Sequence, residues 1–266
     1  MKHRQTLVLL YAYFLIFYYI FCPSSTPAFQ NNLTSQENTV RVISYNIHFG
    51  MGSWGNPNIS EISHFLSSID ADIICLQEVD KFSIRSLFTN QPEVLNSSLS
   101  MQMTYKETST IISGETGNLI LSKFPIVSVE NIPLPSLKYP RSIQKVIVQT
   151  PSGPIRVLNT HLGLSEDIRQ RQIKVLSNVI SRDPLPTILA GDFNTSNLLE
   201  FQDLFSFLKD PAIITNNHRV YTFKNSKYNS RIDYLLMSKN FLIDSYAVPK
   251  VELSDHYPVV VDIKHR

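Results

Sequence analysis

The chain has 266 residues, of which 43% are hydrophobic and 17% are charged. This composition excludes an intrinsically disordered chain and suffices for one α/β domain with a buried core. The formal net charge is +2, and Lys2 and Arg4 lie in the N-terminal segment, so the remainder is close to neutral. A near-neutral chain argues against non-specific wrapping of a nucleic-acid backbone, although it leaves room for a local basic groove.

The first 28 residues have the pattern of an export signal. Basic residues at positions 2 to 4 precede an uncharged apolar and aromatic run from Leu7 to Cys22, and prolines and small residues follow. The length of the run favours a cleaved signal peptide, whereas its tyrosines and the poor cleavage site at Pro27–Ala28 favour an uncleaved anchor. We therefore expect an exported protein, either secreted or attached through this segment to the outer face of the cytoplasmic membrane.

The rest of the chain is expected to form one domain. Residues 29–38 are polar and predict a flexible tether, and residues 39–266 contain no repeat and no second linker. With only Cys22 and Cys75, the chain has no disulfide framework, and Cys75 is expected to be a small buried hydrophobic residue. Nothing in the sequence indicates an obligate protein partner.

Short β-branched runs alternate with helical segments from residue 40 onward. Helices are predicted at 59–69, with Asn58 and Glu61 as a capping pair, at 166–181, capped by Ser165, and at 198–208. The turn Pro151–Pro154 indicates an antiparallel strand pair, whereas strand–helix–strand units indicate crossovers, so the pattern predicts a layered α/β domain with a partly antiparallel sheet. The predicted strands are Val40–Ile47, Asp72–Leu76, Asn118–Leu121, Ile126–Val129, Ile143–Thr150, Ile155–Asn159, Thr187–Ala190, Ile232–Met237 and Pro258–Ile263.

Polar side chains recur where these apolar strands end. Burying a carboxylate there costs on the order of several kcal/mol unless it is paired or bound to a metal. Six such clusters are difficult to explain as solvated surface, and they are explained if they converge on one pocket. The clusters are Asn46–His48, Gln77–Glu78, Asn159–His161, Asp192–Asn194, Arg231–Asp233 and Ser254–His256.

Each of these residues also has a structural interpretation when taken alone. Asn46 and Asn194 are common in turns and caps, and His161 alone is more often a hydrogen-bonded structural histidine than a catalytic one. The pair Asp255–His256 suits either metal binding or proton transfer. Only the whole set of clusters, taken together, favours a catalytic or metal-binding site over structural roles.

The types of side chain favour a hard cation. Carboxylates and amides with few histidines and no paired cysteines suit Mg²⁺, with Mn²⁺ or Ca²⁺ as alternatives, rather than structural zinc. Such an ion polarises a phosphoryl group and stabilises the charge that develops during in-line attack. The sequence therefore predicts metal-dependent hydrolysis of a phosphate ester.

Seven ordered motifs resemble the endonuclease/exonuclease/phosphatase superfamily, whose members include deoxyribonuclease I and neutral sphingomyelinases. The resemblance covers nearly the whole predicted domain, and the order of the motifs makes it specific. The motifs are Tyr45–His48, Leu76–Asp80, Gly117–Ser122, Asn159–Leu162, Gly191–Asn194, Arg231–Tyr234 and Ser254–Pro258.

The resemblance implies a four-layer α/β sandwich in which two packed mixed β-sheets are flanked by helices, with the site at one edge. It implies that Glu78 is the main metal ligand, supported by Asn46 and Asp255. It also implies that Asn118 and Arg141 face the site and bind substrate.

The same resemblance implies the catalytic roles. Asp192 would orient or activate the attacking water, and Asn194 would hold the phosphate. His256 would act as the base or polarise the phosphate, with Asp233 fixing its tautomer. His161 would contact the phosphate or help to protonate the leaving oxygen.

The chain departs from some superfamily members in ways that bear on the substrate. No long basic insertion of the kind that grips duplex DNA occurs between Glu78 and Gly117, and the chain ends just past the last predicted strand, so no accessory lipid-binding domain is expected. Together with the export signal, these features favour a phosphodiesterase that acts on a lipid headgroup or another small phosphodiester outside the cytoplasm.

Two alternatives remain open. The first is an extracellular nuclease, in which Lys224, Lys227 and Arg231, with the aromatic residues between them, would hold phosphates and stack bases, although a solvated loop is the favoured interpretation of this segment. The second is a non-catalytic, membrane-attached binding module, which the presence of every expected site residue disfavours.

Overall fold

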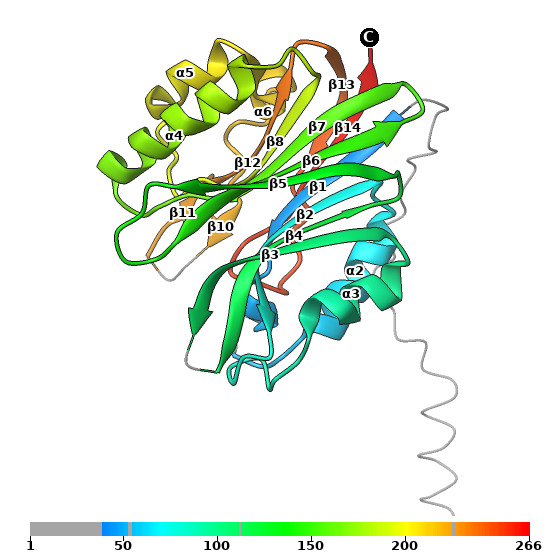
Figure 1. Cartoon of the computed structure of the whole chain (residues 1–266), viewed down its shortest axis with the longest axis vertical. Helices are drawn as coiled ribbons and strands as arrows, with labels where there is room; N and C mark the ends of the chain where they lie inside the picture. Colours follow the sequence, from blue (N-terminus) through cyan, green and yellow to red (C-terminus); the bar gives the residue numbers. More distant parts are fainter. Residues whose placement is uncertain (1–38, 53–54, 112, 225–226) are drawn as a thin grey trace, which may run out of the picture. The chain divides into compact units, whose positions relative to one another are not determined.

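The computed structural model describes residues 39–52, 55–111, 113–224 and 227–266, so the predictions for residues 1–38 lie outside it. Two six-stranded sheets form its centre (Figure 1). The first sheet has the strand order β13 (Phe241–Ala247), β14 (Val259–His265), β1 (Thr39–Asn46), β2 (Ile73–Lys81), β4 (Gly114–Ser122) and β3 (Gln102–Ile111). The second has the order β5 (Ile126–Leu134), β6 (Arg141–Thr150), β7 (Gly153–His161), β8 (Thr187–Asp192), β12 (Asp233–Ser238) and β9 (Leu208–Lys209).

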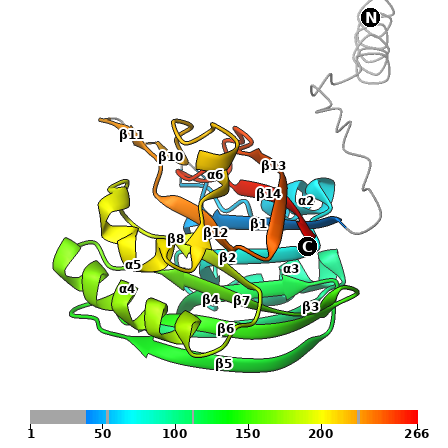
Figure 2. The same cartoon turned by 90° about the horizontal axis from the view of Figure 1, so that it is seen from above.

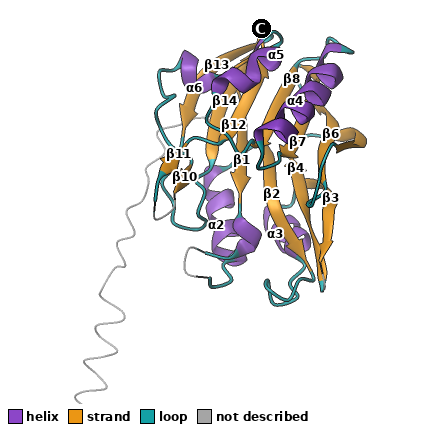
Figure 3. Ribbon diagram, turned by 90° about the vertical axis from the view of Figure 1, so that its left-hand side faces the viewer, coloured by secondary structure: helices purple, strands orange, loops and turns teal. Residues whose placement is uncertain are grey.

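Helices cover the outer face of each sheet, and α4 and α5 lie on the opposite side from α2 and α3 (Figures 2 and 3). No helix within the described part of the chain has the length and apolar character needed to span a membrane. The helices are α2 (Ile59–Ile69), α3 (Gln91–Leu99), α4 (Glu166–Ser181), α5 (Gln202–Phe205) and α6 (Pro211–Ile214), with the 3₁₀ turns η1 (His48–Gly50) and η2 (Leu198–Phe201) and the short hairpin β10 (Phe223–Lys224) and β11 (Asn229–Ser230).

Three apolar cores separate the four layers. The central core joins the two sheets, with Val42 and Cys75 from the first sheet and Val157 from the second. A second core packs α2 and α3 on the first sheet, and a third packs α4 and α5 on the second sheet. Alternation along each strand sends neighbouring residues to opposite cores, as in Val42 and Ile43. The predicted four-layer α/β sandwich is confirmed.

The strand connections place one end of both sheets at a common edge. β1 and β2 are parallel across α2, and β7 and β8 are parallel across α4, while β6 and β7 form the predicted antiparallel pair. The Asn46 amide at the end of β1 donates a hydrogen bond of 2.9 Å to Asp192 at the end of β8. The carboxyl ends of four parallel-paired strands therefore meet at one edge, where open α/β folds generally bind ligands.

Of the predicted helices, two have the expected bounds and one does not, and the predicted caps are absent. The bounds of the helices at 59–69 and 166–181 are confirmed. The capping pair is wrong, because the Asn58 side chain donates to the Leu253 carbonyl, and Ser165 precedes α4 without a capping hydrogen bond from its side chain. The helix at 198–208 is also wrong as a single unit: it divides into η2 and α5 and is followed by β9.

A buried arginine ties α4 to the second sheet. Arg156 on β7 is 1% exposed, and its guanidinium donates to the Thr187 hydroxyl and to the carbonyls of Val179, Ile180 and Asp183. These carbonyls lie at and beyond the end of α4, where the helix leaves its last acceptors unpaired. Arg156 therefore fixes the helix that leads into β8, and β8 carries Asp192.

Candidate active site

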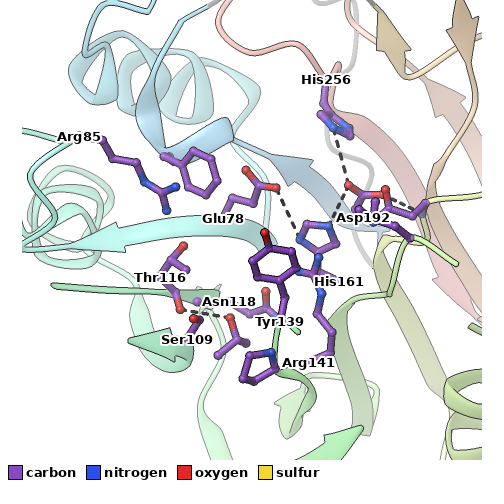
Figure 4. Close-up of a pocket in the computed structure, with 16 residues that line it drawn as sticks. Glu78, Arg85, Ser109, Thr116, Asn118, Tyr139, Arg141, His161, Asp192 and His256 are labelled. Carbon is purple, nitrogen blue, oxygen red and sulfur yellow. Dashed lines mark hydrogen bonds and ion pairs between the residues drawn. The ribbon is translucent and has the colours of Figure 1, made fainter. Parts of the chain in front are cut away.

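A cavity of about 410 Å³ lies at this edge (Figure 4). Strands β2, β3 and β4 of the first sheet, strands β6, β7 and β8 of the second sheet, and the loops around them contribute to its walls. Seven of the ten predicted site residues line it: Glu78, Asn118, Arg141, His161, Asp192, Asn194 and His256.

Glu78 enters the cavity from a bulge in β2. The register with β4 shifts between Leu76 and Val79, so Gln77 and Glu78 together lie opposite Asn118. The φ angle of Glu78 is 55°, which costs a non-glycine residue about 1–2 kcal/mol. A strained, bulged carboxylate at a cavity is typical of a functional site. Burial raises the pKa of Glu78 to about 7, and the charge of Asp192 adds to this rise.

Asp192 lies at the centre of the site. Its strand pairs it with His161 of β7 on one side and with Asp233 of β12 on the other. Its Oδ1 accepts the Asn194 backbone N–H at 2.9 Å, and its Oδ2 accepts the Asn46 amide. Burial opposes its ionisation, but the charges of His161 and His256 and these hydrogen bonds outweigh burial, so the pKa of Asp192 is lowered.

The residue before Asp192 must be small. A Cβ atom on Gly191 would collide with the Thr160 carbonyl of β7. Glycine therefore allows β7 and β8 to approach closely and keeps His161 beside Asp192, with their Nε2 and Oδ2 atoms 3.4 Å apart.

Two carboxylates flank the imidazole of His256. Its Nδ1 lies 2.9 Å from Asp233 Oδ2, and its Nε2 lies 3.7 Å from Asp192 Oδ2. Asp233 is fully buried behind the cavity, and its backbone N–H donates to the Thr222 hydroxyl. Burial opposes protonation of His256, but Asp233 and Asp192 outweigh it and raise its pKa to about 10. Burial also raises the pKa of Asp233 to about 6.

His161 has the opposite electrostatic environment. Burial and the positive charge of Arg141 lower its pKa to about 3. Its Nδ1 lies 3.8 Å from Glu78 Oε1. At neutral pH the site therefore holds one neutral imidazole, His161, and one imidazolium, His256.

Arg141 supplies a positive charge that no group in the described part of the chain pairs with directly. It starts β6 and lines the cavity, and among the described residues its guanidinium has no hydrogen bond or ion pair. Burial lowers the pKa of Arg141, while Glu78 and Asp192 act in the opposite direction. A half-buried guanidinium without a direct partner is a site for an anionic ligand.

Buried amides hold the two sheets together beneath the cavity. Gln77 Nε2 donates to Asn159 Oδ1 at 2.8 Å, and Asn159 Nδ2 donates to the carbonyls of Leu76 and Leu119. Asn46, 1% exposed, bridges the sheets through Asp192. These hydrogen bonds fix the separation of Glu78 on one sheet from Asp192 on the other.

Asp255 lies outside the cavity lining. Its side chain is 35% exposed, and its Oδ1 lies 3.7 Å from His48 Nδ1. Its charge still reaches the site, because it raises the pKa of both Glu78 and His256. The role of metal ligand inferred for Asp255 stays a prediction. Its carboxylate lies beside His48, next to the cavity and not in its lining.

The donor set fits a hard divalent cation. Asp192, Asp233 and His256 bring ligand atoms within 4.8 Å of one another. His256 Nδ1 and Asp233 Oδ2 already contact each other at 2.9 Å, however, and a metal between them would have to break this contact. Glu78 offers carboxylate oxygens without that obstacle, and Mg²⁺ prefers oxygen ligands. Asn46 turns its Nδ2 to Asp192, and its Oδ1 accepts the His48 backbone N–H at 3.0 Å, which leaves that oxygen one further lone pair for a metal.

Several cavity residues carry no functional signal in the sequence. Phe49, Arg85, Ser109, Tyr139 and Leu164 line the cavity. They lie in loops, in the 3₁₀ turn η1 or at a strand bulge, and no periodic or motif signal distinguishes them. The proximity of Arg85 to the motif Leu76–Asp80 is the one feature that could have suggested it.

A second hollow of about 660 Å³ adjoins the cavity and shares Leu164, Asn194 and His256 with it. Phe223 and Tyr228 line it, and the rings of Phe223 and His256 lie 4.8 Å apart. The suggestion that Arg231 contacts phosphate is wrong, because its buried guanidinium binds Asp210 at 2.6 Å.

Comparisons with known proteins agree with this geometry. The structure resembles the crystal structure of an endonuclease/exonuclease/phosphatase from Beutenbergia cavernae, with a TM-score of 0.70 and 22% identity over 86% of this chain and 72% of that one. It also resembles the human Nocturnin catalytic domain with bound sulfate anion, with a TM-score of 0.66 and 21% identity over 88% of this chain and 96% of that one.

Sequence comparison identifies the family. The chain is 30% identical over 173 residues to the uncharacterized protein YbhP of Escherichia coli (strain K12), a match that covers 60% of this chain and 68% of that protein. The model of the endonuclease/exonuclease/phosphatase family matches residues 43–256. Members of this family are phosphoric ester hydrolases that depend on a divalent metal. The chain belongs to the endonuclease/exonuclease/phosphatase family and is a phosphoric ester hydrolase.

Proposed function

We propose that this protein is a divalent-metal-dependent phosphodiesterase that hydrolyses a lipid headgroup or another small phosphodiester outside the cytoplasm. The observation that carries the proposal is that one cavity places the carboxylates of Glu78 and Asp192 together with the unpaired guanidinium of Arg141. A cation at the carboxylates and a cationic side chain near them are what a phosphoryl group requires.

Glu78 and the Asn46 amide would hold the metal, Mg²⁺ being the first choice, and the metal would supply Lewis-acid stabilisation of the phosphoryl oxygens. Asp192 stays ionised at neutral pH because its pKa is lowered, so it can accept a hydrogen bond from the attacking water and orient it. A carboxylate with a low pKa is a weak base, which makes orientation its main contribution.

The two histidines would differ in role because their charges differ. His256, with a pKa of about 10, already carries its proton at neutral pH, so it would polarise the phosphate and not abstract a proton. Arg141 would add a second positive charge to the phosphate. Neutral His161 would donate one N–H to the phosphate or the leaving oxygen, and Asn194, held by its hydrogen bond to the Leu162 carbonyl, would contact the phosphate.

The residues at the mouth of the cavity suit an amphipathic substrate. Tyr139 and Leu164 line the cavity yet are 53% and 71% exposed, and Ile84 and Leu87 are exposed on the loop that carries Arg85. An apolar rim around a charged site suits a lipid headgroup with its hydrocarbon nearby. The export signal predicted for residues 1–28 would bring the protein to such a substrate outside the cytoplasm.

A nuclease is the second candidate. Phe223 and Tyr228 form an aromatic pair, with ring centroids 6.1 Å apart, in the hollow beside His256. Such a pair can stack on unpaired bases of a single strand. This observation favours single-stranded over duplex nucleic acid.

A substrate panel tests the proposal. The full chain with Mg²⁺ is assayed on phosphatidylcholine and sphingomyelin vesicles, a glycerophosphodiester, single-stranded DNA, RNA and plasmid DNA, with Glu78→Gln as the inactive control. We expect Glu78-dependent release of a phosphorylated headgroup or cleavage of the glycerophosphodiester. Cleavage of nucleic acid alone would replace the first proposal by the second, and hydrolysis that survives in Glu78→Gln would reject the assigned site.

A further inference from the structure

The wall of the cavity formed by β3 and β4 carries polar groups without partners. Asn118 is 1% exposed, and its Nδ2 has no hydrogen-bond acceptor among the described residues; the buried hydroxyl of Thr116 likewise has no partner there. A bulge in β3 between Glu107 and Ser109 interrupts the ladder, and Ser109 lines the cavity beside them. Buried donors left unpaired are costly, so their presence at a cavity indicates a ligand.

Arg85 lies on this same side of the cavity and is held rigidly. Its Nε and Nη2 atoms donate to the two oxygens of Asp80 at 2.8 Å each, and Asp80 is fully buried. The guanidinium stacks on Phe49 at 3.2 Å from the ring centroid. A guanidinium has five N–H donors, so the remaining ones stay available to a ligand.

The two residues that hold Arg85 are themselves connected. The side chain of the buried Gln91 accepts the backbone N–H of Asp80 and donates to the carbonyl of Phe49. Phe49 has a φ of 60°, a strained value for an aromatic residue. A Cβ on Gly50 would collide with the Gln91 side chain, so this connection requires glycine. Several constraints thus converge on the orientation of one partly exposed arginine.

The position of Arg85 separates it from the catalytic anion site. Figure 4 shows Arg85, Thr116 and Ser109 on the side of Glu78 and Tyr139 opposite to Arg141. The carboxylates that line the cavity, Glu78 and Asp192, belong to the catalytic side. The cavity therefore offers two places for an anion, one at Arg141 and one at Arg85.

We propose that Arg85, Ser109, Thr116 and Asn118, here called the Arg85 subsite, bind a second phosphate group of the substrate. A fixed guanidinium, an amide N–H and hydroxyl donors together match the oxygens of a phosphate better than those of a neutral group. The preferred substrate is then a phosphodiester that carries a further phosphate beside the bond that is cleaved. This inference rests on the proposed phosphodiesterase function and specifies its substrate.

Matched substrate pairs test the inference. One pair is thymidine 3′-(p-nitrophenyl phosphate) with and without a 5′-phosphate, and the other is lysophosphatidylinositol with and without a 4-phosphate. We expect the wild-type kcat/KM to be about tenfold or more higher for the two-phosphate member of at least one pair, because a charge-assisted contact to phosphate contributes about 1.5 kcal/mol or more. Whichever pair shows the preference identifies nucleotide or lipid as the source of the phosphate.

Variants separate binding from folding. Arg85→Gln should reduce the ratio within that pair to about one, mainly through KM, while Arg171→Gln on the exposed face of α4 should preserve the ratio. Because Arg85→Gln leaves Asp80 buried without its partner, the double variant Asp80→Asn/Arg85→Gln removes both charges, and its melting temperature verifies folding.

The inference is overturned if wild-type protein shows no preference in either pair, or if a preference survives in the double variant. If no compound is hydrolysed, the proposed function fails on its own. Calorimetric binding of the same pairs then decides the subsite: tighter binding of the two-phosphate member that is lost in the double variant supports it, and equal affinities reject it.

Discussion

Glu78 should make metal binding depend on pH. Without metal, burial raises its pKa from 4.5 to about 7, so the folded protein binds this proton more tightly than the unfolded chain does. The stability that Glu78 contributes is therefore fully present below pH 4.5 and is lost as the pH rises through 7, a total of about 3 kcal/mol. A divalent cation replaces the proton and removes this penalty.

The size of the effect follows from the ionised fraction. With a pKa of about 7, roughly 90% of Glu78 is ionised at pH 8 and about 3% at pH 5.5, a factor of about 30 in apparent metal affinity. With Mg²⁺ in large excess over Kd at both pH values, this factor corresponds to about 2 kcal/mol of metal-dependent stabilisation, or roughly 4–8 °C in melting temperature for a domain of this size.

Differential scanning fluorimetry measures this effect directly. The melting temperature of the full chain is recorded with Mg²⁺ and with EDTA at pH 5.5 and pH 8, for wild type and for Glu78→Gln. We expect the Mg²⁺ shift to be larger at pH 8 in wild type and to be small at both values in the variant. An equal shift at both pH values in wild type, or a full pH-dependent shift in Glu78→Gln, would refute the reasoning.

Three further predictions concern other parts of the structure. Asp192→Asn should lower kcat by about 10²–10³-fold, measured with bis-p-nitrophenyl phosphate, because the neutral amide orients the attacking water poorly; a loss below tenfold would contradict that role. Asp233→Asn removes the carboxylate that raises the pKa of His256, so activity should decline with rising pH well before pH 10 in the variant, whereas wild type stays active; identical pH–rate profiles would contradict the imidazolium assignment. Arg156→Met should lower stability by about 3 kcal/mol or more, seen in chemical denaturation, because it leaves buried carbonyls unpaired, while kcat below the melting temperature stays the same; unchanged stability would contradict this account of Arg156.

Residues at the ends of apolar strands could be found from the sequence. Asn46, Glu78, His161 and Asp192 each follow a β-branched run, and the topology brings the ends of those strands to one edge. The polar residues at these positions could not be explained by burial alone, so their convergence was predictable. The helices at 59–69 and 166–181 were predictable because their apolar periodicity is regular.

Other features depend on contacts that local sequence does not encode. Asn58 is a residue type that commonly caps helices, yet its side chain donates a hydrogen bond to the carbonyl of Leu253, a residue far along the chain. The strand β3 was missed because its polar residues alternate poorly and its bulge interrupts the pattern. Arg231, which only the nuclease alternative had placed against phosphate, instead forms an ion pair with buried Asp210, a contact that the local sequence does not encode.

The loop residues around the cavity had no periodic signal. Arg85 and Tyr139 are positioned by tertiary contacts, in the first case by Asp80, Phe49 and Gln91. The pKa values of His161 and His256 also depend on burial and on neighbouring charges, so the sequence left open which of the two is protonated.

An anomalous difference map from a crystal of the full chain soaked in Mn²⁺ tests the central claim most directly. We expect a peak bonded to the Glu78 carboxylate on the side facing Asp192, and no such peak in Glu78→Gln. A peak bonded to His256 and Asp233, or one confined to His48 and Asp255, would contradict it.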